Sequence, residues 1–191
     1  TVAPGLAVAL GRLPFLTGGA ERDPGPRRDV VFAAQAKVPH RLEDREAVLR
    51  ALSEVSPPGS AVVKVRALAG ERQTHHEALD YAELWQDLVV RGVVSSDSVR
   101  FVAGSMAAAL GGARSLVTVS STAALEAIDR GLPVIVLSDF GVNETMINLV
   151  FEGSGCLGDL ADVRADRAFD PDPSWLADNY FHPVGEDDLV E

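Results

Sequence analysis

The sequence predicts an α/β fold, a Rossmann-like doubly wound parallel sheet with helices on both faces in a three-layer αβα arrangement. Short apolar runs recur along the chain, and segments with helical spacing of apolar residues separate them. Gly and Pro gather between these segments, as turns require. A chain of 191 residues that is 47% hydrophobic is also long and apolar enough to bury one sizeable core.

Five apolar runs containing β-branched residues predict buried strands, at 29–36, 60–68, 98–104, 115–120 and 132–139. The segments after them predict helices at 42–55, about 75–90, 106–113, 121–131 and 143–155. We expect Gly131 to stop the fourth helix and Asn143 to cap the fifth. Because ligands of such sheets bind at the carboxyl ends of the strands, the loops after the strands are the expected site.

Three regions are expected along the chain. Residues 1–28 are rich in Gly, Pro and charge and predict a linker or interdomain segment, and 29–160 form the Rossmann-like domain. Residues 161–191 predict an acidic tail with a helix that Trp175, Tyr180 and Phe181 anchor onto the body. The chain lacks an initiator Met, so we interpret it as a piece of a longer protein.

Composition argues against several classes of partner. The formal net charge is −11, with 17 Lys and Arg against 28 Asp and Glu, which argues against nucleic acid and anionic membrane surfaces. A single cysteine, Cys156, excludes an internal disulfide and a Cys-cluster metal site, and it fits a reducing, cytoplasmic location. No uninterrupted apolar stretch is long enough for a membrane span.

The segment 116–141 is the most informative part of the sequence. A buried strand runs into Ser120, Ser121 and Thr122, and a helix begins at once. Hydroxyls beside free backbone N–H groups at a helix N-terminus form an anion site suited to a diphosphate. Glu126 follows one turn later, where a carboxylate can accept hydrogen bonds from a ribose diol. The alternative is an ordinary helix in which these residues serve as caps and favour the dipole.

The spacing of Glu126, Gly131 and Pro133 resembles the nucleotide-sugar motif of GT-B glycosyltransferases. The resemblance implies that Glu126 binds ribose and that the hydroxyl residues before it bind the diphosphate. Asp139 resembles the acidic residue that binds sugar hydroxyls in several of these families, although Phe follows it where Gln is usual. Most of the chain, from VFAAQAKVPHR through VTVSSTAALEAIDRGLPV to NYFH, is similar to a bacterial domain-of-unknown-function family labelled as glycosyltransferases.

Other polar residues follow the first two strands. Gln35 and Lys37 follow the first strand, and the resemblance suggests a phosphate or base contact for them, with a solvated loop as the alternative. Lys64 and Arg66 alternate on one face of the second strand and resemble a phosphate-binding Lys-x-His-Pro of capsule-type transferases, with a salt bridge as the alternative. His76 is a candidate substrate contact. A metal is not expected there, because His75 and His76 would diverge on a helix.

The resemblance implies the C-terminal, nucleotide-sugar-binding half of a glycosyltransferase that transfers a sugar to an unidentified acceptor. It further implies that the acceptor and the general base come from an N-terminal domain of the same protein, so that the chain alone binds donor without turnover. No cofactor is expected, since dipoles and cations replace a metal. The alternatives are a nucleotide-sugar epimerase, a glycerol-phosphate transferase and a non-catalytic binding domain with the same fold.

Overall fold

The computed structural model describes residues 13, 16, 26–65, 80–179 and 181 of the chain. These residues form one six-stranded, parallel sheet in the order β3-β2-β1-β4-β5-β6. The strands are β1 (Asp29–Ala33), β2 (Ala61–Lys64), β3 (Val99–Val102), β4 (Ala113–Thr118), β5 (Val134–Leu137) and β6 (Leu157–Gly158). The predicted Rossmann-like, doubly wound class is therefore confirmed.

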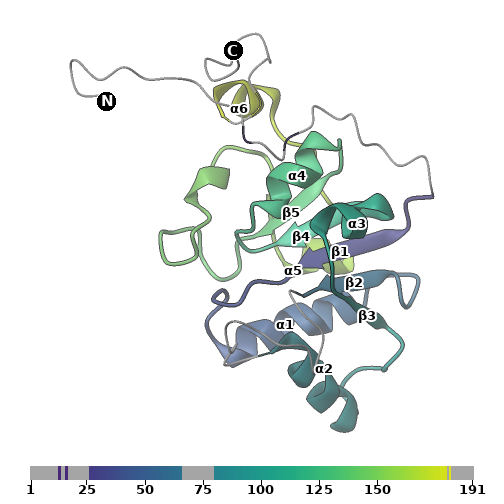
Figure 1. The fold of residues 1–191 in the computed structure, drawn as a ribbon. Coiled ribbons are helices and arrows are strands. Elements are labelled where there is room, and N and C mark those ends of the chain that lie inside the picture. The colour runs from purple at the N-terminus through teal and green to yellow at the C-terminus, as the bar shows by residue number, and fades with distance from the viewer. Residues whose placement is uncertain (1–12, 14–15, 17–25, 66–79, 180, 182–191) are drawn as a thin grey trace.

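Helices cover both faces of the sheet, because successive side chains of each buried strand point to opposite faces. On β1, Val30 and Phe32 enter one core and Val31 and Ala33 the other. The first core packs under α1 (Leu42–Ser53), α2 (Tyr81–Val90) and α5 (Leu160–Arg164). The second packs under α3 (Met106–Gly111) and α4 (Ala123–Asp129), which lie beside each other in Figure 1. None of the helices in the described part of the chain is long and apolar enough to cross a bilayer.

The strand order reverses between β1 and β4. From β1 the chain adds β2 and then β3 on one side, and it returns to place β4 on the other side of β1. At such a switch point the loops leaving the two neighbouring strands run in opposite directions, which opens a crevice at their carboxyl ends. Gln35 follows β1 and Ser120 follows β4, so both lie at this crevice.

A buried arginine holds the loop that follows β1. Arg45 of α1 is 2% exposed, and its Nε and Nη2 atoms donate to the carbonyl oxygens of Pro39 at 2.9 Å and Ala36 at 2.7 Å. Its guanidinium also lies 5.0 Å from the centroid of the Tyr81 ring, a cation–π distance. The backbone immediately after Gln35 is therefore held from the α1 side of the sheet.

The predicted helix over 143–155 is wrong. Asn143 does accept a hydrogen bond from the backbone N–H of Met146 at 3.0 Å, but the chain then turns, and only a 3-10 turn, η1 (Leu149–Phe151), follows. Asn148 is fully buried, accepts from the N–H of Asn143 and donates to the carbonyl of Gly141. An Asn side chain that bonds nearby backbone in this way competes with helical hydrogen bonding.

The sheet and its helices continue beyond the predicted elements. β6 and α5 follow η1, and α5 begins with a capping box in which Asp159 and Asp162 each accept from the other's backbone N–H. The part of the predicted helix 75–90 that precedes Asp80 lies outside the described residues. Residues after 159 therefore contribute to both cores, Leu160 and Val163 to the first and Trp175 to the second.

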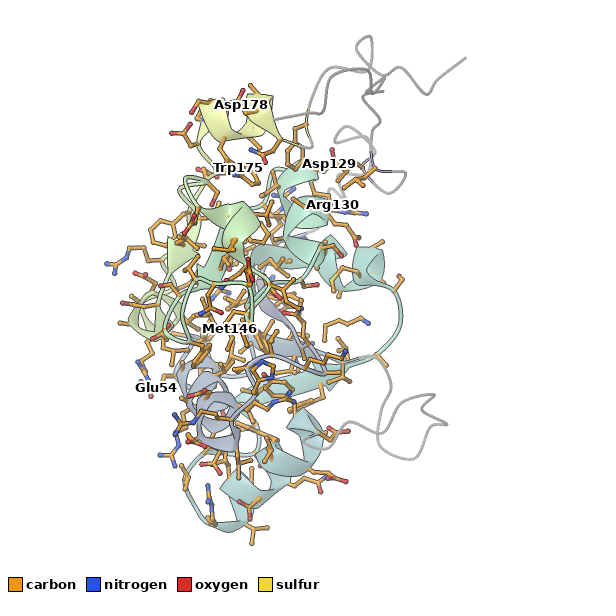
Figure 2. All side chains as sticks on the ribbon, turned by 90° about the vertical axis from the view of Figure 1, so that its left-hand side faces the viewer. Glu54, Asp129, Arg130, Met146, Trp175 and Asp178 are labelled. Atoms are coloured by element: carbon orange, nitrogen blue, oxygen red, sulfur yellow. The ribbon has the colours of Figure 1, made fainter. Side chains whose placement is uncertain are left out.

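The helix α6 (Pro173–Asp178) packs on the α4 side of the fold. Trp175 is 7% exposed, stacks on Phe151 with ring centroids 6.1 Å apart, and donates its indole N–H to the carbonyl of Val150 at 3.0 Å. Figure 2 shows Trp175 between α6 and the body of the molecule. Since Phe151 ends η1, the tryptophan also fixes the end of the loop that leaves β5.

Candidate functional site

Two adjoining cavities lie at the carboxyl ends of the strands around the switch point. One has a volume of about 290 Å³ and a mainly polar lining, made of Ala34, Gln35, Lys64, Val65, Met106, Ser120, Ser121 and Thr122. The other has a volume of about 480 Å³ and a mainly apolar lining, made of Ser120, Thr122, Leu125, Glu144, Ile147, Leu149, Val150 and Phe151. Ser120 and Thr122 border both, so the turn from β4 into α4 separates a polar cavity from an apolar cavity.

Gln35 and Ser120 join the two strands of the switch point. The Gln35 Nε2 atom donates to the Ser120 hydroxyl at 2.9 Å, and the Ser120 backbone N–H donates to Gln35 Oε1 at 2.9 Å. Both ends of the Gln35 amide are therefore engaged by a residue 85 positions away. Gln35 borders the polar cavity, but its hydrogen bonds position Ser120.

The turn between β4 and α4 satisfies most of its own backbone N–H groups. The Ser121 N–H donates to Thr118 Oγ1 at 3.1 Å, and the Ala123 N–H donates to Ser121 Oγ at 3.1 Å. The expected row of free N–H groups at the helix start is therefore not present, because neighbouring hydroxyls already cap them. Across residues 120–124, which the structure describes in full, Thr122 alone has a backbone N–H without a protein acceptor, and its exposed hydroxyl makes no capping bond.

The end of α4 explains two residues of the Glu126, Gly131, Pro133 spacing. Gly131 has φ of +65°, and its backbone N–H donates a hydrogen bond to the carbonyl of Ile128. The next N–H, of Leu132, donates to the carbonyl of Ala127. This is the pair of bonds of a Schellman motif, which favours Gly because other residues are strained there. The predicted helix stop at Gly131 is confirmed, and Pro133 directly precedes β5.

Glu126 has no comparable structural role. Its side chain is half-buried, and desolvation raises the pKa of the carboxyl above its usual value, while the charges of Arg130 and Lys64 act in the opposite direction. Glu126 lines neither cavity, but Lys64, whose charge acts on its pKa, lines the polar cavity. Arg130 follows Glu126 by one helical turn, near the end of α4 in Figure 2. A carboxylate held in this way is typical of a functional group.

Lys64 supplies the positive charge of the polar cavity. It ends β2, lines the cavity and donates from Nζ to the carbonyl of Val65 at 3.0 Å. Lys64 is half-buried and lines the same cavity as Thr122. A compact cation next to hydroxyl donors is suited to an anionic ligand such as a phosphate.

Of the three remaining predicted site residues, the structure describes Asp139 alone. Asp139 is exposed, borders neither cavity, and accepts from the Leu160 N–H at the start of α5, at 3.3 and 3.1 Å for its two oxygens. Arg66 and His76 lie outside the described residues. Within the ranges that the structure describes, no group of three or more His, Cys, Asp or Glu could hold a metal ion.

The apolar cavity is a feature that the sequence alone does not predict. Ile147, Leu149 and Val150 are all exposed hydrophobic residues, and the predicted helix assigned them to one continuous segment with no ligand role. The sequence contains one indication of this cavity, because three large aliphatic residues lie within the four positions 147–150, after a polar stretch and before a Gly-rich turn. Such a run is typical of a binding surface only when the segment is known to be a loop.

The fold and the cavities define a class of protein, a Rossmann-like domain with two cavities at the topological switch point of its sheet. The chain belongs to the family described as "Putative glycosyltransferase (DUF6716)", whose model matches residues 2–191. The resemblance to a glycosyltransferase family is thereby confirmed. Comparison of the sequence with curated proteins gives no match.

The solved structures that are similar to the chain include a sucrose-phosphate synthase and a rhamnosyltransferase. Sucrose-phosphate synthase from Thermosynechococcus elongatus is 18% identical over 73% of this chain and 34% of its own, with a TM-score of 0.46. The spinosyn rhamnosyltransferase SpnG is 17% identical over 90% of this chain and 42% of its own, with a TM-score of 0.38. The chain thus spans well under half the length of either protein, and these likenesses concern the fold alone.

Replacing Gln35 with Ala should lower the free energy of unfolding by about 1–3 kcal/mol, because the Ser120 N–H and hydroxyl lose their partner. Urea unfolding followed by circular dichroism measures the change. Gln86→Ala, on the exposed side of α2, is the matched control and should change stability by less than about 0.5 kcal/mol. Equal effects of the two substitutions would contradict the positioning role of Gln35.

Replacing Glu126 with Gln should stabilise the chain at neutral pH. Burial raises the pKa of the folded carboxyl, so the folded state binds more protons than the unfolded state and its stability falls as pH rises through that window. Below the unfolded pKa, roughly 4.3, both states are protonated and the advantage of Gln should vanish. Urea unfolding at pH 7 and near pH 4 measures this, with exposed Glu152→Gln as the control. A destabilising effect of Glu126→Gln at pH 7 would contradict the assignment.

Proposed function

We propose that the chain binds the nucleotide-sugar donor of a glycosyl-transfer reaction, as the C-terminal-type half of a GT-B enzyme. The observation that supports the proposal most is the polar cavity at the switch point, whose lining includes Lys64 and Thr122. The positive charge of Lys64 also acts on the pKa of the Glu126 carboxyl. A cation and a hydroxyl group can bind the phosphates of a nucleotide, and a carboxylate can bind the two hydroxyls of its pentose. The family description also supports a transferase.

The diphosphate of the donor would occupy the polar cavity. The Lys64 ammonium, the Thr122 hydroxyl and the Thr122 backbone N–H are the donors that an anionic oxygen would meet there. During transfer the bond between the sugar and the terminal phosphate breaks, and negative charge grows on the leaving diphosphate. Donors already oriented toward that charge stabilise the transition state more than the ground state. Ser121 and Ser120 border the same space, but their hydroxyls also hold the turn together.

The ribose would bind at Glu126. An ionised carboxylate can accept hydrogen bonds from both hydroxyls of the pentose, and such bonds favour the charged form. In the structure, by contrast, desolvation raises the pKa of the Glu126 carboxyl. Binding of a diol should therefore lower the pKa of Glu126 and become tighter as the pH rises toward neutrality. The proposal thereby gives a reason for a half-buried carboxylate that lacks a structural role.

The rest of the reaction lies with groups beyond this site. We propose that a second, N-terminal domain of the same protein supplies the general base and part of the acceptor site, and that the reaction takes place in the cytoplasm without a cofactor. Gln35 enters the proposal as a residue that positions Ser120. Sugar contacts by Asp139 and His76 and a phosphate contact by Arg66 stay predictions from the sequence.

The proposal predicts a specific coupling between Glu126 and the ribose hydroxyls. Calorimetry with UDP, CDP, GDP and ADP first identifies the nucleotide that binds most tightly. Glu126→Ala should then weaken this nucleotide about tenfold, which is the effect of removing hydrogen bonds to a charged group. The same substitution should leave the affinity for the 2′,3′-dideoxy analogue unchanged, because that analogue has no hydroxyls to lose.

Lys64→Ala should weaken the ribose and dideoxy nucleotides alike, by about tenfold, because it acts on the phosphates. Lys37→Ala is the matched control, since Lys37 is exposed in the loop after β1 and lines neither cavity. If none of the nucleotides binds, or if Glu126→Ala weakens the ribose and dideoxy forms equally, the proposed function is wrong.

A further inference from the structure

The apolar cavity is a formed pocket whose outer walls are exposed to solvent. Leu125 and Phe151 are buried at its base, whereas Ile147, Leu149 and Val150 are 62%, 40% and 37% exposed. Three large aliphatic side chains within one short loop expose apolar surface that folding would otherwise bury. Contiguous apolar surface around a cavity is typical of a ligand site.

The backbone of Ile147 gives an independent sign that this wall is maintained for a ligand. Ile147 has φ of +60°, a left-handed conformation that β-branched residues rarely adopt. Its N–H donates to the carbonyls of Asn143 and Glu144, and the buried Asn148 fixes the same loop. Asn or Gly would adopt this conformation with less strain. The chain therefore holds an exposed Ile side chain at the mouth of the cavity against its backbone preference.

The order of groups along α4 relates this cavity to the donor. Leu125 lines the apolar cavity, whereas Glu126, the next residue of α4, lines neither cavity and interacts electrostatically with Lys64 of the polar cavity. Thr122 borders both. A donor with its ribose at Glu126 and its phosphates at Lys64 and Thr122 would have its sugar beyond Thr122, next to the apolar cavity. The group that receives the sugar must approach from that direction.

We propose that the apolar cavity is an acceptor subsite, which takes the hydrocarbon group of a neutral acceptor that presents a hydroxyl to the donor sugar. The inference rests on the proposed function. Among the described residues that line the cavity, Glu144 alone is charged. Its exposed carboxylate can accept a hydrogen bond from the acceptor hydroxyl, and it disfavours anionic acceptors by repulsion.

Two probes with the same eight-carbon tail test the chemistry of the cavity. The full chain, labelled at Ile, Leu and Val methyl groups, is titrated by NMR with n-octyl β-D-glucoside below its micelle-forming concentration, and separately with nonanoate. The methyl signals of Ile147, Leu149 and Val150 should shift, and those of Val90, which is 85% exposed on α2, should not. The neutral glucoside should bind severalfold more tightly than nonanoate, and Glu144→Gln should remove most of that difference.

A matched pair of substitutions separates binding from folding. Ile147→Asn should keep or raise the Tm, because Asn tolerates the left-handed conformation, and it should weaken the glucoside roughly fivefold through lost apolar contact. Val90→Asn should leave the affinity unchanged. Unchanged binding in Ile147→Asn, or equal shifts of the Val90 and Ile147 methyl groups, would overturn the acceptor subsite.

A third titration relates the cavity to the donor. Saturating nucleoside diphosphate should leave the glucoside affinity equal or higher, since the two cavities adjoin without overlapping, whereas competition would place both ligands in one site and overturn the inference. Nucleotide binding without glucoside binding overturns the acceptor subsite alone. Glucoside binding in a chain that binds no nucleotide refutes the proposed function, and the acceptor role with it.

Discussion

The reciprocal hydrogen bonds between Gln35 and Ser120 are the constraint on which the site depends. They join the loops that leave β1 and β4 at the one place where the strand order reverses. A doubly wound sheet leaves a crevice there, and without a connection the two loops would be independent. With it, the turn into α4 becomes a fixed partition, because Ser120 and Thr122 border a polar cavity on one side and an apolar cavity on the other.

Further hydrogen bonds hold the backbone on either side of this turn. Arg45 holds the loop behind Gln35, Thr118 accepts from the Ser121 N–H, and Ser121 caps the start of α4. Each of these polar groups is used to hold backbone, so few donors remain for a ligand. The groups that the proposal assigns to the ligand are Thr122 in this turn, Lys64 at the end of β2 and Glu126 in the first turn of α4.

The order of strands and helices could be predicted because hydrophobic periodicity is local. β1, β2, β3, β5 and α1 to α4 each fall within a predicted segment, β4 begins two residues before its predicted start at 115, and the Gly131 stop follows from backbone conformation. The helix over 143–155 failed because the burial of Asn148 decides its hydrogen bonding, and burial cannot be read from neighbouring residues. β6 has two residues, too few to show a period.

The candidate site was predictable only in part, for a related physical reason. The sequence located the turn after β4 and the carboxylate of Glu126, because strand, hydroxyls and helix follow one another there. It offered Gln35 as a ligand contact, which stays a prediction because Gln35 lines the polar cavity but also bonds Ser120, 85 residues away. It also assigned backbone N–H groups to a phosphate that local hydroxyls already cap. Whether a polar group serves the fold or a ligand depends on tertiary contacts.

A structure of the chain with its preferred nucleoside diphosphate tests the central claim most directly. The account predicts phosphate oxygens within hydrogen-bonding distance of the Lys64 ammonium and the Thr122 hydroxyl, and both pentose hydroxyls on the Glu126 carboxylate, with the apolar cavity left open beside them. A nucleotide bound away from the β4–α4 turn, or one whose pentose points away from Glu126, would contradict it.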